Sequence, residues 1–312
     1  MSVAAASSAL PFAIEFGRPL TAEIPPERGV GLQLNLPVLG GQTREVIFST
    51  PGTPAEKPGL RLWASGDLLI GWAAETVKNE RNLKAQTQAL YERVLAAAQG
   101  RHLYRIWNYV PHINAETDGL ENYRAFCQGR SLAFEKSLGE SFPRLLSAAS
   151  AVGAHDDFLT LIFVAGSTAP RHVENPEQIP AYRYPAEHGP RAPSFSRATV
   201  AHAGGRVFTF ISGTSAIKGH ATVAPDALPE QLDCTLDNLR LISREAGTGE
   251  SLGAGSVRER HFKIYLRRPA DFPSVRARLE RDLLRPGDSV TYLRSDICRA
   301  ALHIEIEATL IG

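Results

Sequence analysis

One order of predicted strands and helices occurs twice along the 312-residue chain, and it constrains the fold more than any single motif. Alternating and amphipathic periodicities define these elements, and glycines mark the ends of two helices. The first half contains two strands in 60–73 around Ser65-Gly66, a helix at 82–100 ending at Gly100, a strand at 102–111, a helix at 119–138, a short helical stretch at 142–153 and a strand at 156–166.

The second half follows the same order. We therefore predict an α+β fold of two tandem domains, each a mixed β-sheet with helices packed on one face. The predicted divisions are an N-terminal domain at 1–165, an inter-domain loop at 166–198 and a C-terminal domain at 199–312. The elements of the second half are two strands in 206–221 around Ser212-Gly213, a helix at 228–247, a strand at 260–269, a helix at 271–284, and strands in 289–298 and 301–310.

The segment between the halves, 166–198, is rich in Pro, Gly, Tyr and Arg and lacks a helix or strand period. A stretch of this length is either a linker or a functional loop. A plain linker would be polar and flexible. Aromatic residues such as Tyr182 and Phe195 stand among arginines here, which favours a segment that packs down as a pocket wall.

Composition excludes several classes of protein. The formal charge of +1 gives no general attraction to nucleic acid or to an anionic membrane, and no apolar stretch is long enough to span a membrane. Cys127, Cys234 and Cys298 are far apart and odd in number, which indicates a reducing compartment without a disulfide framework. The start of the chain, residues 1–16, lacks the basic region of a signal peptide, so we expect a cytoplasmic protein.

Motifs for cofactors, metals and a serine nucleophile are missing. The chain has no GxxxxGK[ST], no GxGxxG after a strand, no HExxH and no GxSxG, and its nine histidines show no metal-ligand spacing. We therefore expect chemistry that needs neither a cofactor nor a metal ion.

The last predicted strand poses the main question about function. Alternation puts Leu302, Ile304, Ile306 and Ala308 on one face and His303, Glu305, Glu307 and Thr309 on the other. The polar face either is solvated, as in many antiparallel strands, or holds a working acid. Periodicity alone favours solvent. The equivalent strand of the first half, 156–166, carries no carboxylate in its interior, so the acids belong to the second copy only.

Several segments together resemble the chorismatase family, whose fold is similar to duplicated RidA-like (YjgF-like) domains. They are YRIWNYVPHIN and GLENYRAFCQGRSLAF within 104–134, YRYPAEHGPRAPSFSRA at 182–198, FISGTSAIKGH at 210–220 and DICRAALHIEIEA at 296–308. The resemblance implies removal of pyruvate from the small molecule chorismate without a cofactor. The C-terminal domain is then the catalytic one, and the N-terminal domain is a degenerate copy.

The resemblance also implies roles for three residues. Glu305 matches the glutamate of the last strand that acts as the acid in this family. Cys298, seven residues earlier, matches the cysteine of the subgroup that makes 3-hydroxybenzoate, and Gly213 fits the glycine of that subgroup. In the small RidA-like imine deaminases a carboxylate-binding arginine occupies roughly the position of Tyr292, so deaminase activity is not implied.

Chorismate has two carboxylates and an enol ether, and an enzyme that acts on it needs particular side chains for both features. Protonation of the enol ether needs an acid whose pKa is raised by burial, which Glu305 satisfies if it faces a pocket. We expect Glu307 to be a solvated carboxylate at the rim. The two carboxylates of chorismate would bind to arginine or hydroxyl groups. The candidates are Arg294, which shares a face with Tyr292, Asp296 and Cys298 in the predicted strand, and Arg191, Tyr184 and Arg267.

Three alternatives stay open at this point. The enzyme could yield 4-hydroxybenzoate as well as 3-hydroxybenzoate, or hydrolyse chorismate to a dihydroxycyclohexadiene carboxylate. A RidA-like module that binds a ligand without turnover is the alternative from another class. The oligomeric state is equally open: RidA-like domains usually form trimers, but a duplicated chain could remain a monomer.

Overall fold

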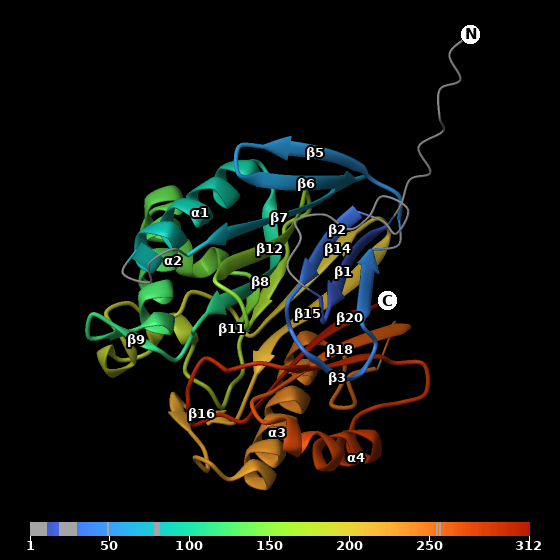
Figure 1. Ribbon diagram of the computed structural model, residues 1–312. Helices are drawn as coiled ribbons and strands as arrows, with labels where there is room; N and C mark the ends of the chain where they lie inside the picture. Colours follow the sequence, from blue (N-terminus) through green and yellow to red (C-terminus); the bar gives the residue numbers. More distant parts are fainter. Residues whose placement is uncertain (1–10, 19–29, 49, 78–81, 254, 256) are drawn as a thin grey trace.

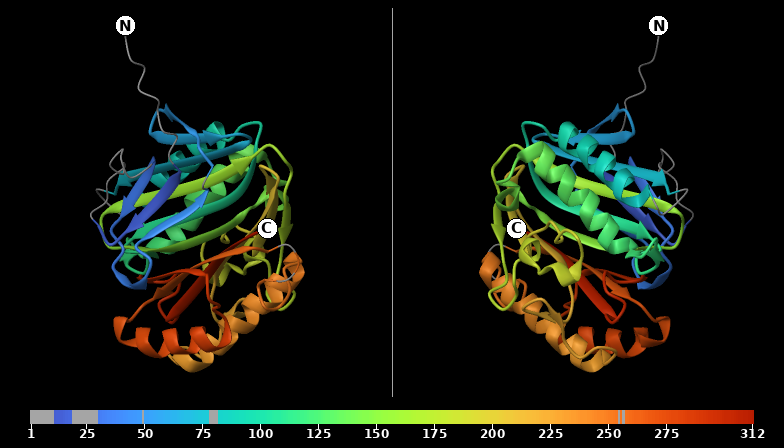
Figure 2. Two further views of the ribbon diagram at one scale, coloured as in Figure 1. Left: turned by 90° about the vertical axis from the view of Figure 1, so that its right-hand side faces the viewer. Right: turned by 90° about the vertical axis from the view of Figure 1, so that its left-hand side faces the viewer.

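The computed structural model describes residues 11–18, 30–48, 50–77, 82–253, 255 and 257–312 (Figure 1). Two β-sheets lie between two layers of helices, as Figure 2 shows from two sides. The predicted fold class is confirmed: the chain is α+β, with two mixed sheets in tandem, each covered by helices on one face.

The first sheet has the strand order β11-β8-β12-β7-β6-β5. Strands β8 and β11 run parallel, and the other pairs are antiparallel. Helices α1 (Leu83–Ala97) and α2 (Asn122–Leu138) bury apolar side chains against one face of this sheet. The strands are β5 (Thr53–Lys57), β6 (Leu60–Ser65), β7 (Leu68–Thr76), β8 (His102–Pro111), β11 (Ala148–Ala154) and β12 (Phe158–Gly166).

The second sheet has the order β13-β14-β15-β20-β18-β19-β3. Helices α3 (Leu228–Ala246) and α4 (Phe272–Asp282) cover its outer face, and α3 ends at Gly247, whose φ of 88° is the left-handed cap that glycine favours. The strands are β3 (Val38–Gly41), β13 (Arg171–Val173), β14 (Ala198–Ala203), β15 (Arg206–Thr214), β18 (Glu259–Leu266), β19 (Ser289–Arg294) and β20 (Ile304–Ile311).

The two halves share one topology, as predicted. Strands β6, β7, β12, β8 and β11 follow one another in the first sheet as β14, β15, β20, β18 and β19 do in the second, with the same parallel and antiparallel pairs. The turns differ from the prediction. Gly66-Asp67 joins β6 to β7, but its counterpart is Gly204-Gly205, with φ of 56° and 74°, and not Ser212-Gly213.

Ser212 and Gly213 lie inside β15, so the predicted hairpin at this point is wrong. Ile211 pairs with Ala308 and Thr214 pairs with Ile306, which leaves one extra residue on β15 and defines a β-bulge. A glycine in a strand-like run is compatible with a turn or with a bulge, and the sequence does not separate the two. The hairpin comes later, between β16 (Ile217–Lys218) and β17 (Ala221–Thr222).

Two other elements differ from prediction near the junction of the halves. Residues 148–153 of the helical stretch predicted at 142–153 lie in strand β11 (Ala148–Ala154) instead, because small side chains suit a strand packed between β8 and the second half. Strand β19 ends at Arg294, so Asp296 and Cys298 lie in a loop instead of on a strand face. The loop follows β11 there: the Gly153 amide donates to the Asp296 carbonyl at 2.7 Å.

The N-terminal segment adds a small third sheet with the order β2-β1-β4, formed by β1 (Phe12–Phe16), β2 (Val30–Leu34) and β4 (Arg44–Phe48). Between them, β3 pairs with β19 of the second half, although it lies within the first predicted domain. The division at 165 and 198 stays a prediction. The expectation about a signal peptide depends largely on residues 1–10, which lie outside the described residues.

The space between the two large sheets is filled by aromatic and apolar side chains, including Trp107, Phe210 and Tyr265. In β20, Ile304 and Ile306 pack toward α3 and α4, whereas Ile311 belongs to this inner core. Glu305, Glu307 and Thr309 share the inner face with Ile311, and all three are buried. The alternative of a solvated polar face is therefore wrong for this strand.

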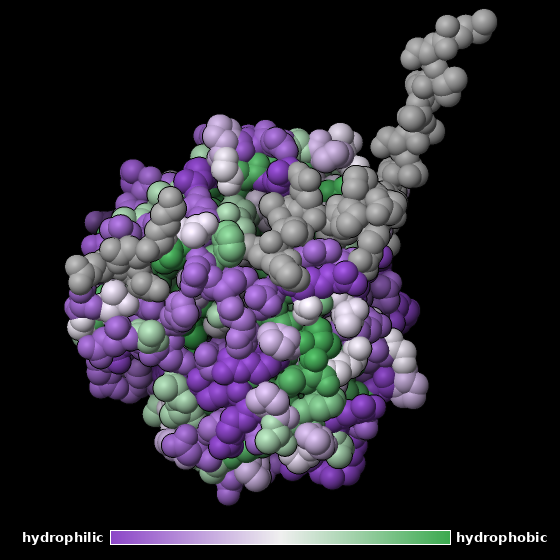
Figure 3. Space-filling model, viewed as in Figure 1, coloured by the Kyte–Doolittle hydropathy of each residue, from purple (hydrophilic) through white to green (hydrophobic). Residues whose placement is uncertain are grey.

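Hydrophilic residues cover most of the face in Figure 3, with a smaller apolar area. Within the described ranges, no helix has the length and apolar character that crossing a membrane requires.

Candidate active site

A cavity of about 420 Å³ lies where the edge strand β11 of the first sheet meets the bulge of β15 and the start of β20. This volume suits a small organic ligand. The walls come from α2, from the 184–197 part of the inter-half segment, and from the loop after β19. Both halves of the chain therefore contribute to the cavity.

Glu305 lies in the cavity wall with 3% of its surface exposed. Its Oε1 has no hydrogen-bond partner among the residues described. Burial, and next the negative charge of Glu307, raise the pKa of Glu305 to about 8, against the opposing charges of Arg105 and Arg197. A carboxyl in this state is protonated at neutral pH and can donate its proton.

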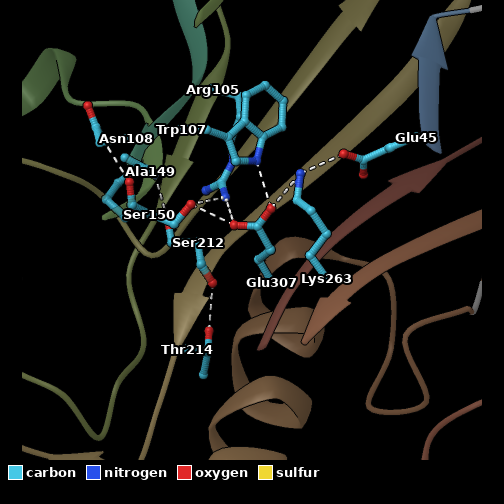
Figure 4. A network of polar contacts seen from close by, with 11 residues as sticks. Glu45, Arg105, Trp107, Asn108, Ala149, Ser150, Ser212, Thr214, Lys263 and Glu307 are labelled. Atoms are coloured by element: carbon cyan, nitrogen blue, oxygen red, sulfur yellow. Dashed lines mark hydrogen bonds and ion pairs between the residues drawn. The ribbon is translucent and has the colours of Figure 1, made fainter. Parts of the chain in front are cut away.

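Glu307, two residues along the same face, is held by four donors (Figure 4). Its Oε2 accepts from Arg105 Nη2 at 2.7 Å and Ser150 Oγ at 2.6 Å, and its Oε1 accepts from Trp107 Nε1 at 2.7 Å. Lys263 Nζ lies 2.9 Å from Oε1.

Burial acts to raise the pKa of Glu307, but the charges of Lys263 and Arg105 and the donated hydrogen bonds outweigh it and lower the pKa. Glu307 is therefore a buried anion, and the prediction of a solvated rim carboxylate is wrong.

Gly213 lies directly against the Glu305 carboxyl. A Cβ atom at position 213 would be 2.0 Å from Glu305 Oε1 and 3.1 Å from Ser150 Cβ. The bulge of β15 thus puts a glycine at a point where the Glu305 carboxyl fills the space that a side chain would need. Ser212, the preceding residue, turns to the first half and accepts from the Ala149 amide at 2.8 Å.

Two predicted residues, Tyr184 and Cys298, also line the cavity. The hydroxyl of Tyr184 accepts from Arg197 Nη2 at 2.8 Å. Burial, and next the charge of Glu305, raise the pKa of the Cys298 thiol to about 12, so it stays protonated at neutral pH. All three cysteines are free.

The three predicted arginines do not line the cavity. Arg191 forms an ion pair with Glu135 at 2.9 Å. Arg294 lies 3.3 Å from Asp296, and Arg267 bonds to the same carboxylate at 2.9 Å and to several backbone carbonyls. Arg267 and Arg294 tie the loop after β19 to its surroundings, whereas Arg191 ties the inter-half segment to α2.

Four other arginines line the cavity, and two of them, Arg130 and Arg197, are buried. Arg130 of α2 is 2% exposed and lies over the rings of Tyr91 and Phe134, and its Nε and Nη2 have no hydrogen-bond partner in the described part of the chain. Arg197 is 7% exposed and lies over the ring of Phe195. Two buried cations at one cavity suit a ligand with more than one anionic group.

A signal for Arg130 was present in the sequence. It follows Phe126 and precedes Phe134 by four residues, which puts an arginine on the apolar stripe of a helix. A similar signal was present for Arg105, which lies two residues before Trp107 and four before Tyr109 in β8 and therefore shares the face of these aromatic residues.

One group of side chains in the described ranges could hold a metal ion: Glu187, His188 and His220, whose ligand atoms lie within 4.8 Å of one another. The two imidazoles are already hydrogen-bonded, with His188 Nε2 and His220 Nδ1 at 2.9 Å. Their separation in sequence explains why no metal spacing was seen.

Comparison with known proteins shows similarity to one enzyme family. Residues 47–165 match the family model described as chorismatase FkbO/Hyg5-like, N-terminal. A 3-hydroxybenzoate synthase from Streptomyces hygroscopicus is 37% identical over 222 residues, which is 67% of this chain and 63% of that protein. This chain thus matches less than two thirds of the length of that relative.

Two further matches cover a larger share of the matched protein. A chorismatase from Streptomyces hygroscopicus is 37% identical over 255 residues, 78% of this chain and 72% of that protein. A chorismatase crystal structure superposes with a TM-score of 0.84 at 28% identity, over 99% of this chain and 95% of that one. Because a chorismatase with 37% identity is matched over more than two thirds of its length, the chain belongs to the chorismatase family.

Proposed function

We propose that this protein is a chorismatase that converts chorismate into 3-hydroxybenzoate and pyruvate without a cofactor. The observation that carries the proposal is Glu305, a buried carboxyl whose pKa is raised to about 8 and whose Oε1 lacks a partner in the described structure. The names of the relatives support the substrate, and that of one relative supports the product.

The first step is proton transfer from Glu305 to the terminal methylene carbon of the enolpyruvyl group. This converts the enol ether into an oxocarbenium ion, which makes the pyruvyl oxygen a good leaving group. The acid must be protonated before substrate binds, and a pKa near the working pH suits a general acid. After transfer, Glu305 is an anion next to the positive charge formed on the substrate, which is favourable in a buried site.

The substrate's two carboxylates would be held by the unpredicted arginines. Arg130 offers Nε and Nη2, one edge of the guanidinium and the geometry of a bidentate carboxylate contact. Arg197 and the Tyr184 hydroxyl that it contacts would take the second carboxylate. We assign Arg130 and Arg197 this role in place of Arg191, Arg267 and Arg294, which do not line the cavity.

The ring then loses the C3–O bond as its own 4-hydroxyl attacks C3, which releases pyruvate and gives a 3,4-epoxide. Opening of the C4–O bond and loss of the C3 proton yield 3-hydroxybenzoate. Protons balance, because one goes to the pyruvyl methyl group and one to the epoxide oxygen, while the 4-hydroxyl and C3 each lose one. No water is consumed, so the reaction is a lyase reaction.

We assign Cys298 the choice of product. Its thiol is protonated at neutral pH, so it is not a thiolate nucleophile. An apolar, weakly donating group at the cavity wall keeps water from C3 and leaves the internal 4-hydroxyl as the attacking group. A smaller residue would admit water and favour the dihydrodiol.

The test is incubation of the purified protein with chorismate and no added metal or cofactor. Pyruvate release is followed with a coupled lactate dehydrogenase assay, and the aromatic product is identified by chromatography. Release of pyruvate with 3-hydroxybenzoate supports the proposal. A dihydroxycyclohexadiene carboxylate or 4-hydroxybenzoate would correct the product, and background pyruvate would favour a ligand-binding module without turnover.

A further inference from the structure

Glu307 occupies the centre of a buried cluster of charges next to the catalytic cavity (Figure 4). Lys263 lies opposite Glu307 in the register of β18 and β20, and Arg105 approaches from β8 of the other sheet. Glu45, from β4, accepts from Lys263 at 2.6 Å. All four side chains are at least nine-tenths buried. The cluster contains two cations and two anions.

We propose that Glu307 is a positioning residue, which neutralises the buried cations Arg105 and Lys263 so that Glu305 keeps its proton for catalysis. The catalytic part of this inference rests on the proposed function. The role is distinct from catalysis, because every oxygen of Glu307 is engaged by protein donors and none is left for a substrate.

The reason lies in what Arg105 and Lys263 would do without Glu307. Arg105 Nη2 binds both Glu307 and Ser150, at 2.7 and 2.9 Å, and its Nη1 has no hydrogen-bond partner within the described ranges. A buried guanidinium that loses its carboxylate is strongly drawn to the next one, and Glu305 is two residues away on the same face. Glu305 would then ionise and could no longer act as the acid.

Other charges near Glu305 do not replace this effect. Arg197, Arg130 and Arg299 line the same cavity, and each cation favours the ionised form of Glu305. The Cys298 thiol is protonated, as are the hydroxyls of Tyr123 in α2 and Tyr265, which lies opposite Glu305 in β18. The remaining titratable groups of the lining are Glu121, Arg124, Tyr184 and His188. Glu307 is thus a buried anion that opposes the ionisation of Glu305, which several cations favour.

The test compares pH profiles of kcat/KM for pyruvate release in wild type and Glu307→Gln. The alkaline limb reports loss of the proton from the acid of the free enzyme. We expect Glu307→Gln to move this limb to lower pH by about one unit or more. Glu307→Asp, which keeps the charge, should move it less. Asp288→Asn breaks a different buried ion pair, with Arg260 of β18, and should leave the limb in place.

A second readout does not depend on turnover. The infrared band of a protonated carboxyl that disappears in Glu305→Gln is assigned to Glu305 and titrated with pH. In Glu307→Gln this band should be lost at lower pH than in wild type. If the wild type releases no pyruvate, the proposed function fails, while this titration still decides the role of Glu307.

Glu45→Gln covers the case in which Glu307→Gln does not fold. It leaves both cations and Glu307 in place but removes one negative charge from Lys263, so both readouts should shift in the same direction by a smaller amount. A folded Glu307→Gln variant with an unshifted Glu305 titration would overturn the proposal. Where only Glu45→Gln folds, its unshifted titration would do the same.

Discussion

Replacement of Gly213 by alanine tests whether the position of the Glu305 carboxyl matters for catalysis. The added Cβ would be 2.0 Å from Glu305 Oε1 and 2.6 Å from its Cδ, whereas real Cβ atoms essentially never approach another atom within 3.0 Å. The carboxyl must therefore move by at least about 1 Å, because Ser150 Cβ at 3.1 Å leaves the new methyl group little other room.

A displacement of this size has a definite kinetic cost. Misplacing a reacting group by 1 Å reduces the rate by about 100-fold, which corresponds to about 2.7 kcal/mol in the activation free energy. We expect kcat for pyruvate release to fall by about this factor, with a smaller change in KM, since the two arginines stay in place. The crowding itself should lower the free energy of unfolding by about 1–3 kcal/mol.

Gly71→Ala is the matched control. It crowds the core of the first sheet, where the new Cβ would be 2.3 Å from Phe163 Cε1, and it does not touch the cavity. Both variants are compared by the coupled pyruvate assay and by thermal unfolding. Gly71→Ala should lose stability and keep kcat. If Gly213→Ala also keeps the kcat of wild type, the reasoning about the acid's position is refuted.

Three further predictions concern the same cavity. The pKa of Glu305 is raised on folding, so its protonation stabilises the fold fully below about pH 4.5 and this contribution is lost as the pH rises toward about 8. As the pH rises from about 4.5 to about 8, the free energy of unfolding of Glu305→Gln should therefore increase relative to that of wild type, by up to roughly 5 kcal/mol in denaturant unfolding. A difference that does not change with pH would contradict the raised pKa. Arg130→Met should lower kcat/KM by about 10- to 100-fold, mainly through KM, because a charged hydrogen bond to a carboxylate is lost; an unchanged KM would remove Arg130 from substrate binding. Cys298→Ala should shift the product from 3-hydroxybenzoate toward the dihydrodiol in chromatography, and an unchanged product would remove Cys298 from product choice.

The fold was largely predictable from the sequence because its periodicities are strong and occur twice. Helix α3, with its terminal Gly247, and strand β20 both lie within about three residues of their predicted bounds. The elements that differ are those whose conformation depends on distant partners. Strand β11 has the alanines of a helix and becomes a strand because β8 lies beside it, and Ser212-Gly213 becomes a bulge because β20 sets its register.

The site was predictable only in part, for a related reason. Glu305 could be singled out because the strand pattern and the family resemblance both pointed to it. The sequence has 34 lysines and arginines, and nothing local tells which of them converge on one cavity. Arg130 and Arg197 come from a helix and a loop that meet only in the folded chain, while Arg191 and Arg294 are taken up by neighbouring carboxylates.

The central claim is that a buried glutamic acid expels pyruvate from chorismate in this cavity. The most direct measurement is the rate of pyruvate release from chorismate at neutral pH by wild type and by Glu305→Gln, both shown to be folded, in buffer without added metal or cofactor. We predict turnover with 3-hydroxybenzoate as the product for wild type, and a loss of at least about 100-fold for the variant. Equal rates in the two proteins would contradict the role of Glu305, and background release in both would contradict the activity itself.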